Sequence, residues 1–282
     1  MVPACYNGEM TSVPADADLE QVRFVLCDLD GVVWLRRQAL PGAADAIERL
    51  RRSGRRVLFV TNNSMSRIGE QERALAAIDV PAHGDVVTSA QAAASLVAAN
   101  ERVLVCGGEG VVEAVEQRGA IAVREGDAHA VIVGLHLDFD YGRLQAANAA
   151  IRGGARFIAT NDDATFPTPD GPTPGAGSLV AAVATVSATS PVIAGKPNST
   201  MARLVGDRCG AAFSAASALM VGDRWSTDGL FAETIGCSFA MVRSGVTSPG
   251  GPISDRPGES GPVSVRLDVA DLAAVADAVL SG

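Results

Sequence analysis

Short apolar runs alternate with longer amphipathic segments along most of this chain of 282 residues. The first apolar run, 23–28, is followed by a helical pattern near 42–53, a strand at 56–60, a helix near 67–77 and a short strand at 85–88. Strands that alternate with helices in this way predict a parallel sheet covered by helices. We therefore expect an α/β protein.

A second set of alternating units begins near residue 89. Its strands are predicted at 102–106, 130–134 and 155–159, and its helices near 109–118, 141–152 and 176–188. The last elements are predicted as a helix near 199–206, strands at 218–221 and 238–242, and a helix near 270–280. Residues 1–20 are polar and contain proline, which predicts a mobile tail. The stretch 245–262, rich in Gly, Pro and Ser, predicts a surface loop.

The composition argues against several classes of partner, location and metal site. A formal net charge of −9 and a pI of about 4.8 argue against nucleic acid or an anionic membrane surface as the main partner. No apolar run is long enough to span a membrane, and the first twenty residues carry no secretory signal, so a cytoplasmic protein is expected. The five cysteines are scattered without a CxxC pair, which favours reduced thiols over a disulfide framework or a zinc site.

The most informative polar residues follow the first apolar run, Phe24–Cys27. Asp28 and Asp30 are two apart, so on a strand their side chains point the same way. Two close carboxylates repel each other and need a cation or a shared proton. Gly31 lets backbone N–H groups approach an anion. At the carboxyl end of a strand in an open α/β sheet, where active sites form, these features suggest a hard metal such as Mg²⁺ and phosphoryl chemistry.

Three further polar groups follow or flank other strands. They are Thr61-Asn62-Asn63-Ser64, Gly195-Lys196-Pro197, and Gly222-Asp223-Arg224 with Asp228. Each group alone is typical of a turn, but four such groups in this order are hard to explain as turns. The set resembles the haloacid dehalogenase superfamily of aspartate-nucleophile phosphatases, over about residues 23–245.

The spacing of the motifs resembles one branch of that superfamily. The 33 residues from Asp28 to Thr61 are too few for an inserted domain, whereas the 135 from Thr61 to Lys196 can hold a cap of about 100 residues. A cap in the second gap resembles class IIA, which includes p-nitrophenyl, phosphoglycolate, glycerol-3-phosphate and pyridoxal phosphate phosphatases. The stretch Phe157–Asp163, followed by Pro174–Ser178, is a mark of that branch.

The resemblance implies a Rossmann-like, doubly wound parallel-sheet core with an inserted α/β cap domain. The expected division is a tail at 1–20, a catalytic core at 21–88 and 190–282, and a specificity cap at 89–189. The implied activity is that of a Mg²⁺-dependent phosphoric monoester hydrolase, which acts through an aspartyl-phosphate on a small phosphorylated metabolite. A homodimer is compatible with the resemblance, since relatives often pair through their caps.

Carried over onto this chain, the family mechanism gives the first two motifs their roles. Asp28 would be the nucleophile that forms the aspartyl-phosphate. Asp30 would protonate the leaving alkoxide and then activate water as general base. Thr61 would hydrogen-bond the phosphoryl group through its hydroxyl, Asn62 would add a second contact, and the backbone at Gly31 would help to bind the anion.

The remaining motifs would supply positive charge. Lys196 would offset the charge of the phosphoryl group and the nucleophile as a compact cation. Mg²⁺ would be bound by Asp28, by the backbone carbonyl of Asp30 and by Asp223. Asp228 would orient Lys196 or a metal-bound water without binding the metal itself.

The cap is expected to choose the substrate, because the core motifs are generic. Contacts are predicted from two loops, through Leu135 and His136 in one and Phe166 and Pro167 in the other. In relatives that act on pyridoxal phosphate, the positions that match Phe166 and Leu135 look like histidine and tyrosine, so that substrate is disfavoured. Glycerol 3-phosphate or 2-phosphoglycolate is preferred, with pyridoxal phosphate, sugar phosphates and nucleotides as alternatives.

Three other interpretations compete with a phosphatase. A mutase with the same intermediate would carry its cap between the first two motifs, where the gap of 33 residues leaves no room. The segment Cys106-Gly107-Gly108-Glu109-Gly110 hints at a dinucleotide-binding loop, but the third glycine of that pattern is missing. A catalytically inactive module that binds a phospho-ligand is disfavoured, because the residues of the four motifs are intact.

Overall fold

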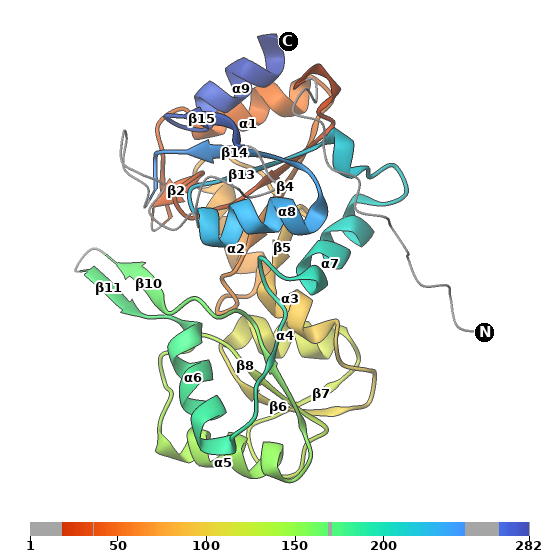
Figure 1. Ribbon diagram of the computed structural model, residues 1–282, viewed down its shortest axis with the longest axis vertical. Coiled ribbons are helices and arrows are strands. Elements are labelled where there is room, and N and C mark those ends of the chain that lie inside the picture. Colours follow the sequence, from red (N-terminus) through yellow and green to blue (C-terminus); the bar gives the residue numbers. More distant parts are fainter. Residues whose placement is uncertain (1–18, 36, 169–170, 246–264, 282) are drawn as a thin grey trace.

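The chain folds as two stacked α/β units, each built on its own parallel sheet (Figure 1). The computed structural model describes residues 19–35, 37–168, 171–245 and 265–281. The upper unit in Figure 1 holds both ends of the described chain, and the lower unit is inserted between its halves. The α/β class and the parallel sheets predicted from the sequence are thereby confirmed.

The upper sheet, here called the core sheet, has six parallel strands. Their spatial order is β15 (Val265–Val269), β14 (Ser238–Val242), β13 (Ala218–Gly222), β1 (Phe24–Cys27), β4 (Arg56–Thr61) and β5 (Val86–Thr88). β1 pairs with β13 on one side and with β4 on the other. The carboxyl ends of these three neighbouring strands therefore meet at one edge of the sheet.

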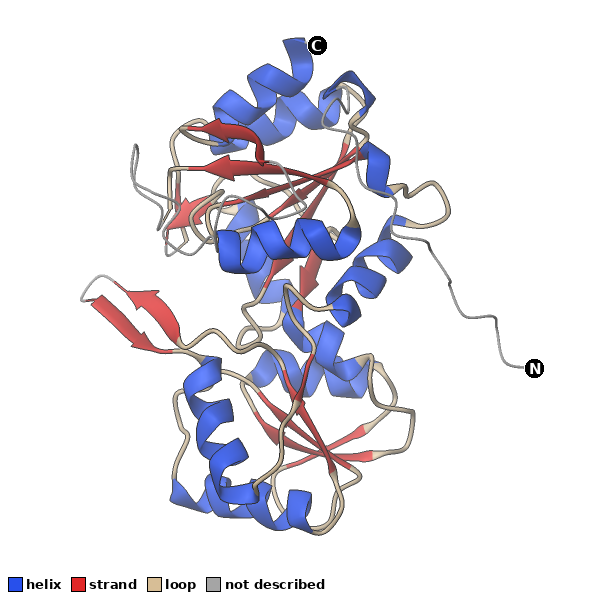
Figure 2. Cartoon of the chain, viewed as in Figure 1, coloured by secondary structure: helices blue, strands red, loops and turns tan. Residues whose placement is uncertain are grey.

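Helices cover both faces of the core sheet (Figure 2). Those of the core unit are α1 (Ala43–Arg52), α2 (Ile68–Ala76), α7 (Ser199–Cys209), α8 (Leu230–Ile235) and α9 (Leu272–Ser281). Val25 and Cys27 of β1 pack with α1 and α9, whereas Phe24 and Leu26 belong to the cluster that contains α7 and α8. All four residues of β1 are buried, as expected for a strand covered on both sides.

Several short elements of the core unit have no clear periodicity in the sequence. They are the 3₁₀ turns η1 (Leu19–Gln21) and η2 (Ala215–Ser217), the antiparallel pair β2 (Trp34–Leu35) and β3 (Gln38–Ala39), and the π-helical turn η3 (Trp225–Gly229). The sequence pattern does not predict β15 or α8 either. The helical elements among them span less than two turns, and β2 and β3 have two residues each, so these elements repeat no period.

The lower sheet, here called the cap sheet, has five parallel strands. Their order is β12 (Val192–Ile193), β9 (Arg156–Ala159), β8 (Ala130–Val133), β6 (Arg102–Cys106) and β7 (Ile121–Val123). Its helices are α4 (Glu109–Gln117), α5 (Tyr141–Arg152) and α6 (Ala176–Ser187), and the hairpin of β10 (Thr165–Thr168) and β11 (Gly171–Pro174) projects from one side (Figure 1).

The edge strand β12 corrects one expected boundary. The sequence pattern assigns residue 190 onward to the core, but Val192 pairs with Ile158 and Ile193 with Ala159 in the cap sheet. These two residues add an edge to β9 just before the chain returns to the core. The segment that leads into Lys196 is therefore held by the cap.

A short alanine-rich helix, α3 (Ser89–Ala94), joins the two units. Thr88 and Gln91 form a capping box at its start, and it packs against α4 and α7. A single buried apolar cluster includes Leu26 of the core sheet, the alanines of α3 and Ile132 of the cap sheet. The cap is therefore packed onto the core through a continuous hydrophobic interior.

Other expectations from composition meet the structure only in part. Residues 1–18 of the predicted tail and 246–264, which include most of the predicted surface loop, lie outside the described residues. Four cysteines in the described part of the chain are buried and form no disulfide, which fits reduced thiols; they are Cys27, Cys106, Cys209 and Cys237. Within the described residues, no helix combines the length and apolarity that a membrane crossing requires.

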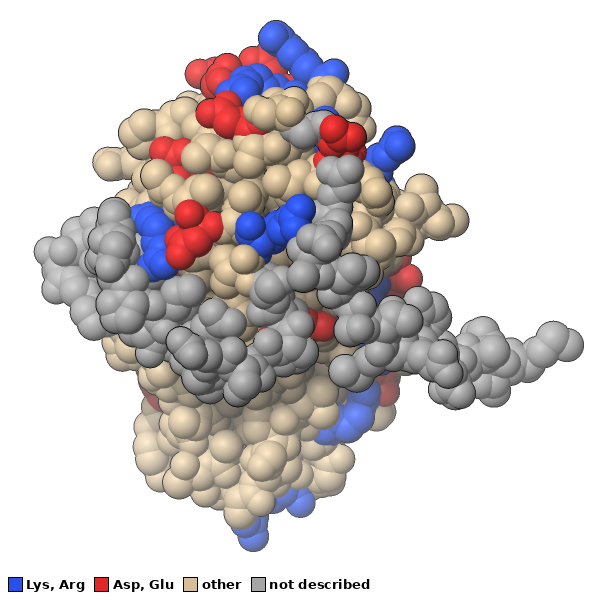
Figure 3. Space-filling model, turned by 45° about the horizontal axis from the view of Figure 1, so that its top comes forward, with Lys and Arg blue, Asp and Glu red and all other residues tan. Residues whose placement is uncertain are grey.

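Acidic and basic side chains are interspersed on the face of the molecule in Figure 3. Surface ion pairs such as Arg49–Asp277 at 2.7 Å and Arg243–Asp268 at 2.6 Å join the two signs of charge. The described residues of this face do not form a broad basic patch of the kind that binds nucleic acid, which agrees with the acidic net charge.

Candidate active site

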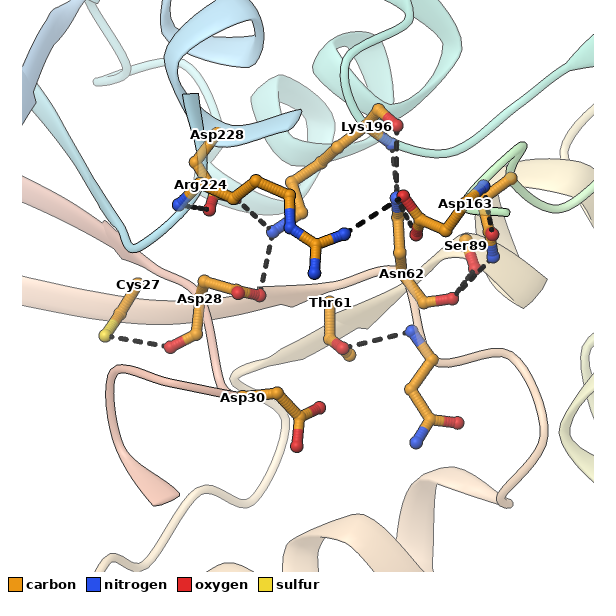
Figure 4. Close-up of polar contacts among 12 residues, drawn as sticks. Cys27, Asp28, Asp30, Thr61, Asn62, Ser89, Asp163, Lys196, Arg224 and Asp228 are labelled. Carbon is orange, nitrogen blue, oxygen red and sulfur yellow. Dashed lines mark hydrogen bonds and ion pairs between the residues drawn. The ribbon is translucent and has the colours of Figure 1, made fainter. Parts of the chain in front are cut away.

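The motif residues gather at the carboxyl edge of the core sheet, around a cavity of about 400 Å³ between core and cap (Figure 4). The core contributes residues at the ends of β1, β4 and β13, and the cap contributes residues from the loops after β8 and β9. Lys196 comes from the stretch that follows β12 and returns to the core. The residues that line the cavity include Asp28, Asp30, Gly31, Thr61, Asn62, Leu135, Asn161, Asp163, Thr165, Lys196, Asp223 and Arg224. A cavity of this volume suits a small metabolite.

Lys196 lies between two carboxylates in the floor of the site. Its Nζ donates to Asp28 Oδ1 at 2.8 Å and to Asp228 Oδ1 at 2.6 Å. The side chains of Lys196 and Asp228 are only 2% and 1% exposed. Burial alone would lower the pKa of Lys196, but the two carboxylates raise it above its ordinary value. The lysine is thus held as a cation that orients Asp28.

Three carboxylates of this region lie close enough to share a cation. One oxygen each from Asp28, Asp223 and Asp228 lies within 4.8 Å of the others. Burial raises the pKa of Asp228, and Lys196 opposes that rise. Gly31 borders this group with a φ of +90°, and a Cβ atom there would collide with the carboxylate of Asp223. Glycine is therefore required beside Asp223 for both conformation and space.

Asp30 lies near this group, but its carboxylate is not one of the three. Trp34 of β2 donates its Nε1–H to Asp30 Oδ1 at 3.1 Å. Burial, followed by the negative charge of Asp28, raises the pKa of Asp30 to about 7. A carboxyl group with such a pKa can both give and accept a proton near neutrality.

Thr61 and Asn62 differ in what they can offer to an anion. The Thr61 hydroxyl accepts from the backbone N–H of Asn63 at 3.1 Å, which leaves its hydrogen to donate into the cavity. The Asn62 carboxamide instead accepts from Lys196 N at 2.9 Å and donates to Lys196 O and Asp163 Oδ2, each at 3.1 Å. The polar atoms of the Asn62 side chain are therefore engaged with protein neighbours. Asn62 also lines the cavity, and its contact with a phosphoryl group stays a prediction.

The four cap residues that are predicted to contact the substrate differ in where the structure places them. Leu135 lines the cavity. His136 is buried, 4% exposed, with Nδ1 at 3.0 Å from the carbonyl of Gly134, and its ring packs edge-on against Phe139. Burial lowers the pKa of His136. His136 does not line the cavity, in contrast to its expected place in the wall. Phe166 and Pro167 fall in β10, and their side chains lie outside the described part of the chain.

Three residues to which the sequence pattern assigns no role belong to the site. They are Trp34, Asp163 and Arg224, of which the last two line the cavity. Asp163 Oδ1 lies 4.0 Å from Arg224 Nη1. Burial raises the pKa of Asp163, while Asn62 and Arg224 oppose this rise. The signal in the sequence is the position of Asp163 and Arg224 within motifs that follow strands.

The glycine-rich segment after β6 has a packing explanation. A Cβ atom on Gly108 would collide with Met65, and one on Gly110 would collide with Ser66, both in the core loop after β4. Gly110 N also donates to Met65 O at 3.0 Å. These glycines let the cap approach the core backbone, so no dinucleotide is needed to account for them.

Comparisons with known proteins place these features in a family. The protein-family model described as haloacid dehalogenase-like hydrolase matches residues 25–121. The model described as HAD-hydrolase-like matches residues 193–267. The first match contains Asp28 and Thr61, and the second contains Lys196 and Asp223.

Individual relatives are similar over most of this chain. The D-glycerol 3-phosphate phosphatase of Mycobacterium tuberculosis is 41% identical over 234 residues, which are 79% of this chain and 64% of the length of the relative. Phosphoglycolate phosphatase 2 of Arabidopsis thaliana is 32% identical, over 81% of this chain and 85% of the relative.

A solved structure extends the comparison to three dimensions. The crystal structure of a glycerol phosphate phosphatase from Mycobacterium tuberculosis in complex with magnesium has a TM-score of 0.78 and 35% identity. The match covers 90% of this chain and 77% of that chain. A coverage of 90% includes the cap as well as the core, so the similarity is not limited to the six-stranded unit.

Proposed function

Because this chain belongs to the haloacid dehalogenase-like hydrolase family, we propose that its cavity is the active site of a Mg²⁺-dependent phosphatase that acts on a small phosphorylated metabolite. The observation that carries the proposal is the buried Lys196 between Asp28 and Asp228, with Asp223 beside them. Such a cluster has no evident packing purpose, since a buried ion pair is weak support for stability.

Asp28 is the proposed nucleophile. A carboxylate oxygen of Asp28 attacks phosphorus, the bond from phosphorus to the ester oxygen breaks, and an aspartyl-phosphate forms. Asp30 gives its proton to the departing oxygen, which a carboxyl with a pKa of about 7 can do. Asp30 then takes a proton from water as that water attacks phosphorus, which releases inorganic phosphate and restores Asp28.

The other core residues bind and orient in this scheme. The Thr61 hydroxyl and the backbone beside Gly31 hold the phosphoryl oxygens. Lys196 keeps the Asp28 carboxylate in place and offsets negative charge. Asp228 holds Lys196 from the buried side.

The carboxylate group fits Mg²⁺, because hard oxygen donors are its preferred ligands and three of them converge here. Asp28 and Asp223 would hold the ion, together with the backbone carbonyl of Asp30. Lys196 occupies Asp228 Oδ1, which supports a role for Asp228 outside the direct ligand set. When bound, Mg²⁺ supplies positive charge that stabilises the transferring phosphoryl group.

Glycerol 3-phosphate and 2-phosphoglycolate are the substrates we propose. The names of two relatives support them, as does a cavity of about 400 Å³ with Leu135 and Thr165 in its wall. Pyridoxal phosphate, sugar phosphates and nucleotides are the alternatives. We also propose a specificity role for the cap, a cytoplasmic location, and a homodimer that pairs through its caps.

The test of the proposed function is phosphate release from a panel of these phosphomonoesters, with p-nitrophenyl phosphate as a generic ester. Turnover should require Mg²⁺, fall to background in chelator and return when excess Mg²⁺ is added, because the converging carboxylates need the ion to accept a phosphate. Equal turnover in chelator, or none with any ester of the panel, would contradict the proposal.

Asp30→Asn should affect substrates unequally. An alkoxide such as that of glycerol needs a proton to leave, whereas p-nitrophenolate is a stable anion. We expect kcat/KM for glycerol 3-phosphate to fall by about 10²- to 10⁴-fold, and that for p-nitrophenyl phosphate to fall much less. Because kcat/KM covers steps up to the first irreversible one, equal losses for both esters would count against Asp30 as the general acid.

A further inference from the structure

Several contacts from the cap and from the connecting helix α3 meet at one core residue, Asn62. Its backbone carbonyl accepts from Ser89 Oγ at 2.7 Å and from Asn161 Nδ2 at 2.8 Å. Its carboxamide contacts Lys196 and Asp163, as Figure 4 shows. Asn62 is thus surrounded by the two stretches of chain that leave the cap sheet.

Lys196 itself is carried by one of those stretches. Ala194 N donates to Ala159 O at 2.9 Å, and Gly195 N donates to Thr160 O at 2.8 Å. These bonds extend the pairing of β12 with β9 up to the residue before Lys196. The backbone of the lysine is therefore built onto the edge of the cap sheet, while its Nζ reaches the carboxylates of the core.

The carboxamide of Asn62 fixes that backbone on the core side. It accepts from Lys196 N and donates to Lys196 O, at 2.9 and 3.1 Å, so it pairs with both polar groups of the residue. A Cβ atom on Gly195 would lie 2.6 Å from Asn62 Oδ1, so glycine is required for this approach. Any rotation of the Asn62 carboxamide would break both bonds.

Asp163, in the stretch that follows β9, accepts a hydrogen bond from the second N–H of the Asn62 carboxamide. Its Oδ2 accepts from Asn62 Nδ2 at 3.1 Å, and its Oδ1 faces Arg224 Nη1 at 4.0 Å. The side chain is 23% exposed and lies in the wall of the cavity. Its neighbour Asp162 is exposed and does not line the cavity.

We propose that Asp163 is a cap-borne positioning residue of the phosphatase site, which holds the Asn62 carboxamide in the orientation that places Lys196 between Asp28 and Asp228. The inference rests on the proposed function. Asp163 touches none of the reacting atoms in this scheme; it acts through Asn62 and Lys196. A cap that is not docked would leave Lys196 without this alignment, so the cap contributes to chemistry as well as to substrate choice.

The test compares three substitutions of Asp163 in the full chain with Mg²⁺. Asp163→Ala and Asp163→Leu remove the acceptor for Asn62, whereas Asp163→Asn keeps an acceptor oxygen and loses only the charge that faces Arg224. Asp162→Ala is the matched control on the same loop. For each variant, kcat and KM for p-nitrophenyl phosphate, the Mg²⁺ concentration of half-maximal activity and the urea midpoint of unfolding are measured.

Misplacing a catalytic group by about 1 Å can cost about 100-fold in rate. We expect Asp163→Ala and Asp163→Leu to lower kcat by about 10- to 100-fold, with KM and the Mg²⁺ response almost unchanged. Asp163→Asn should retain most of the rate, and Asp162→Ala all of it. In an Asn62→Ala background, Asp163→Ala should add little further loss.

Three results would overturn the inference. One is a kcat of folded Asp163→Leu equal to that of wild type, which would leave only a packing role. Another is an Asp163→Asn variant as slow as Asp163→Ala, which would assign the effect to Arg224. The third is full additivity with Asn62→Ala. If wild type itself releases no phosphate from any ester, the proposed function has failed, which is a separate outcome.

Discussion

Asp28→Asn should abolish phosphate release and leave the fold intact. The carboxamide has nearly the shape of the carboxylate, and its oxygen can still accept from Lys196 Nζ, which is 2.8 Å away in the wild-type protein. It cannot form an acyl phosphate, because it lacks the anionic oxygen that attacks phosphorus. Loss of a nucleophile typically costs at least about 10⁴-fold in kcat. Steady-state phosphate release with the preferred ester measures this effect.

A direct control detects the covalent intermediate. Wild-type protein quenched in acid during turnover should carry the added mass of a phosphoryl group on the peptide that contains Asp28, and Asp28→Asn should not. The intact mass of the variant checks that the amide has not reverted to aspartate. A variant of confirmed mass with turnover near that of wild type would remove Asp28 as the nucleophile.

Lys196→Met should lose both activity and stability. Methionine fills a similar volume but leaves the carboxylates of Asp28 and Asp228 facing each other without the cation, and Asp228 is fully buried. Removing one partner of a buried ion pair typically destabilises a protein by about 3–5 kcal/mol. Urea unfolding of the metal-free protein measures the free energy of unfolding, and phosphate release measures the activity.

Two further variants separate charge from volume in that experiment. Arg52→Met breaks the exposed pair of Arg52 with Glu48, at 2.5 Å, and should change the free energy of unfolding by less than about 1 kcal/mol. Lys196→Met combined with Asp228→Asn removes the buried charge of Asp228 as well, and should recover stability but not activity. A Lys196→Met variant as stable as wild type would show that the lysine does not offset these carboxylates.

The catalytic edge of the sheet is predictable from sequence because it follows from general rules of α/β proteins. Residues at the carboxyl ends of β1, β4 and β13, or directly after them, must meet, since these strands are parallel neighbours and their carboxyl ends coincide. The alternation of strands and helices is therefore enough to bring Asp28, Thr61 and Asp223 together. Lys196 is identified through resemblance, and its backbone continues an edge strand of the other sheet.

The hydrogen-bond partners of these residues are harder to predict from the sequence, because they depend on tertiary contacts. Nothing in the sequence pairs Trp34 with Asp30, or Asp163 with Asn62 across 101 residues of chain. The helix α3 is not among the predicted elements, although the sequence carries a signal for its start. Thr88 and Gln91 have the spacing of a capping box, which indicates a helix start even where alanines hide the amphipathic period.

The shared hydrophobic interior around α3 limits the exchange of cap domains between this enzyme and its relatives. Its alanines pack between α4 of the cap and α7 of the core. At that point the two units share one hydrophobic core, and neither has a complete core of its own. A cap taken from a relative would bring side chains shaped for a different α3 and α7. Substrate choice in this architecture can therefore diverge readily by point substitution in the cavity wall, whereas exchange of whole caps requires the connecting helix and its core partner to change together.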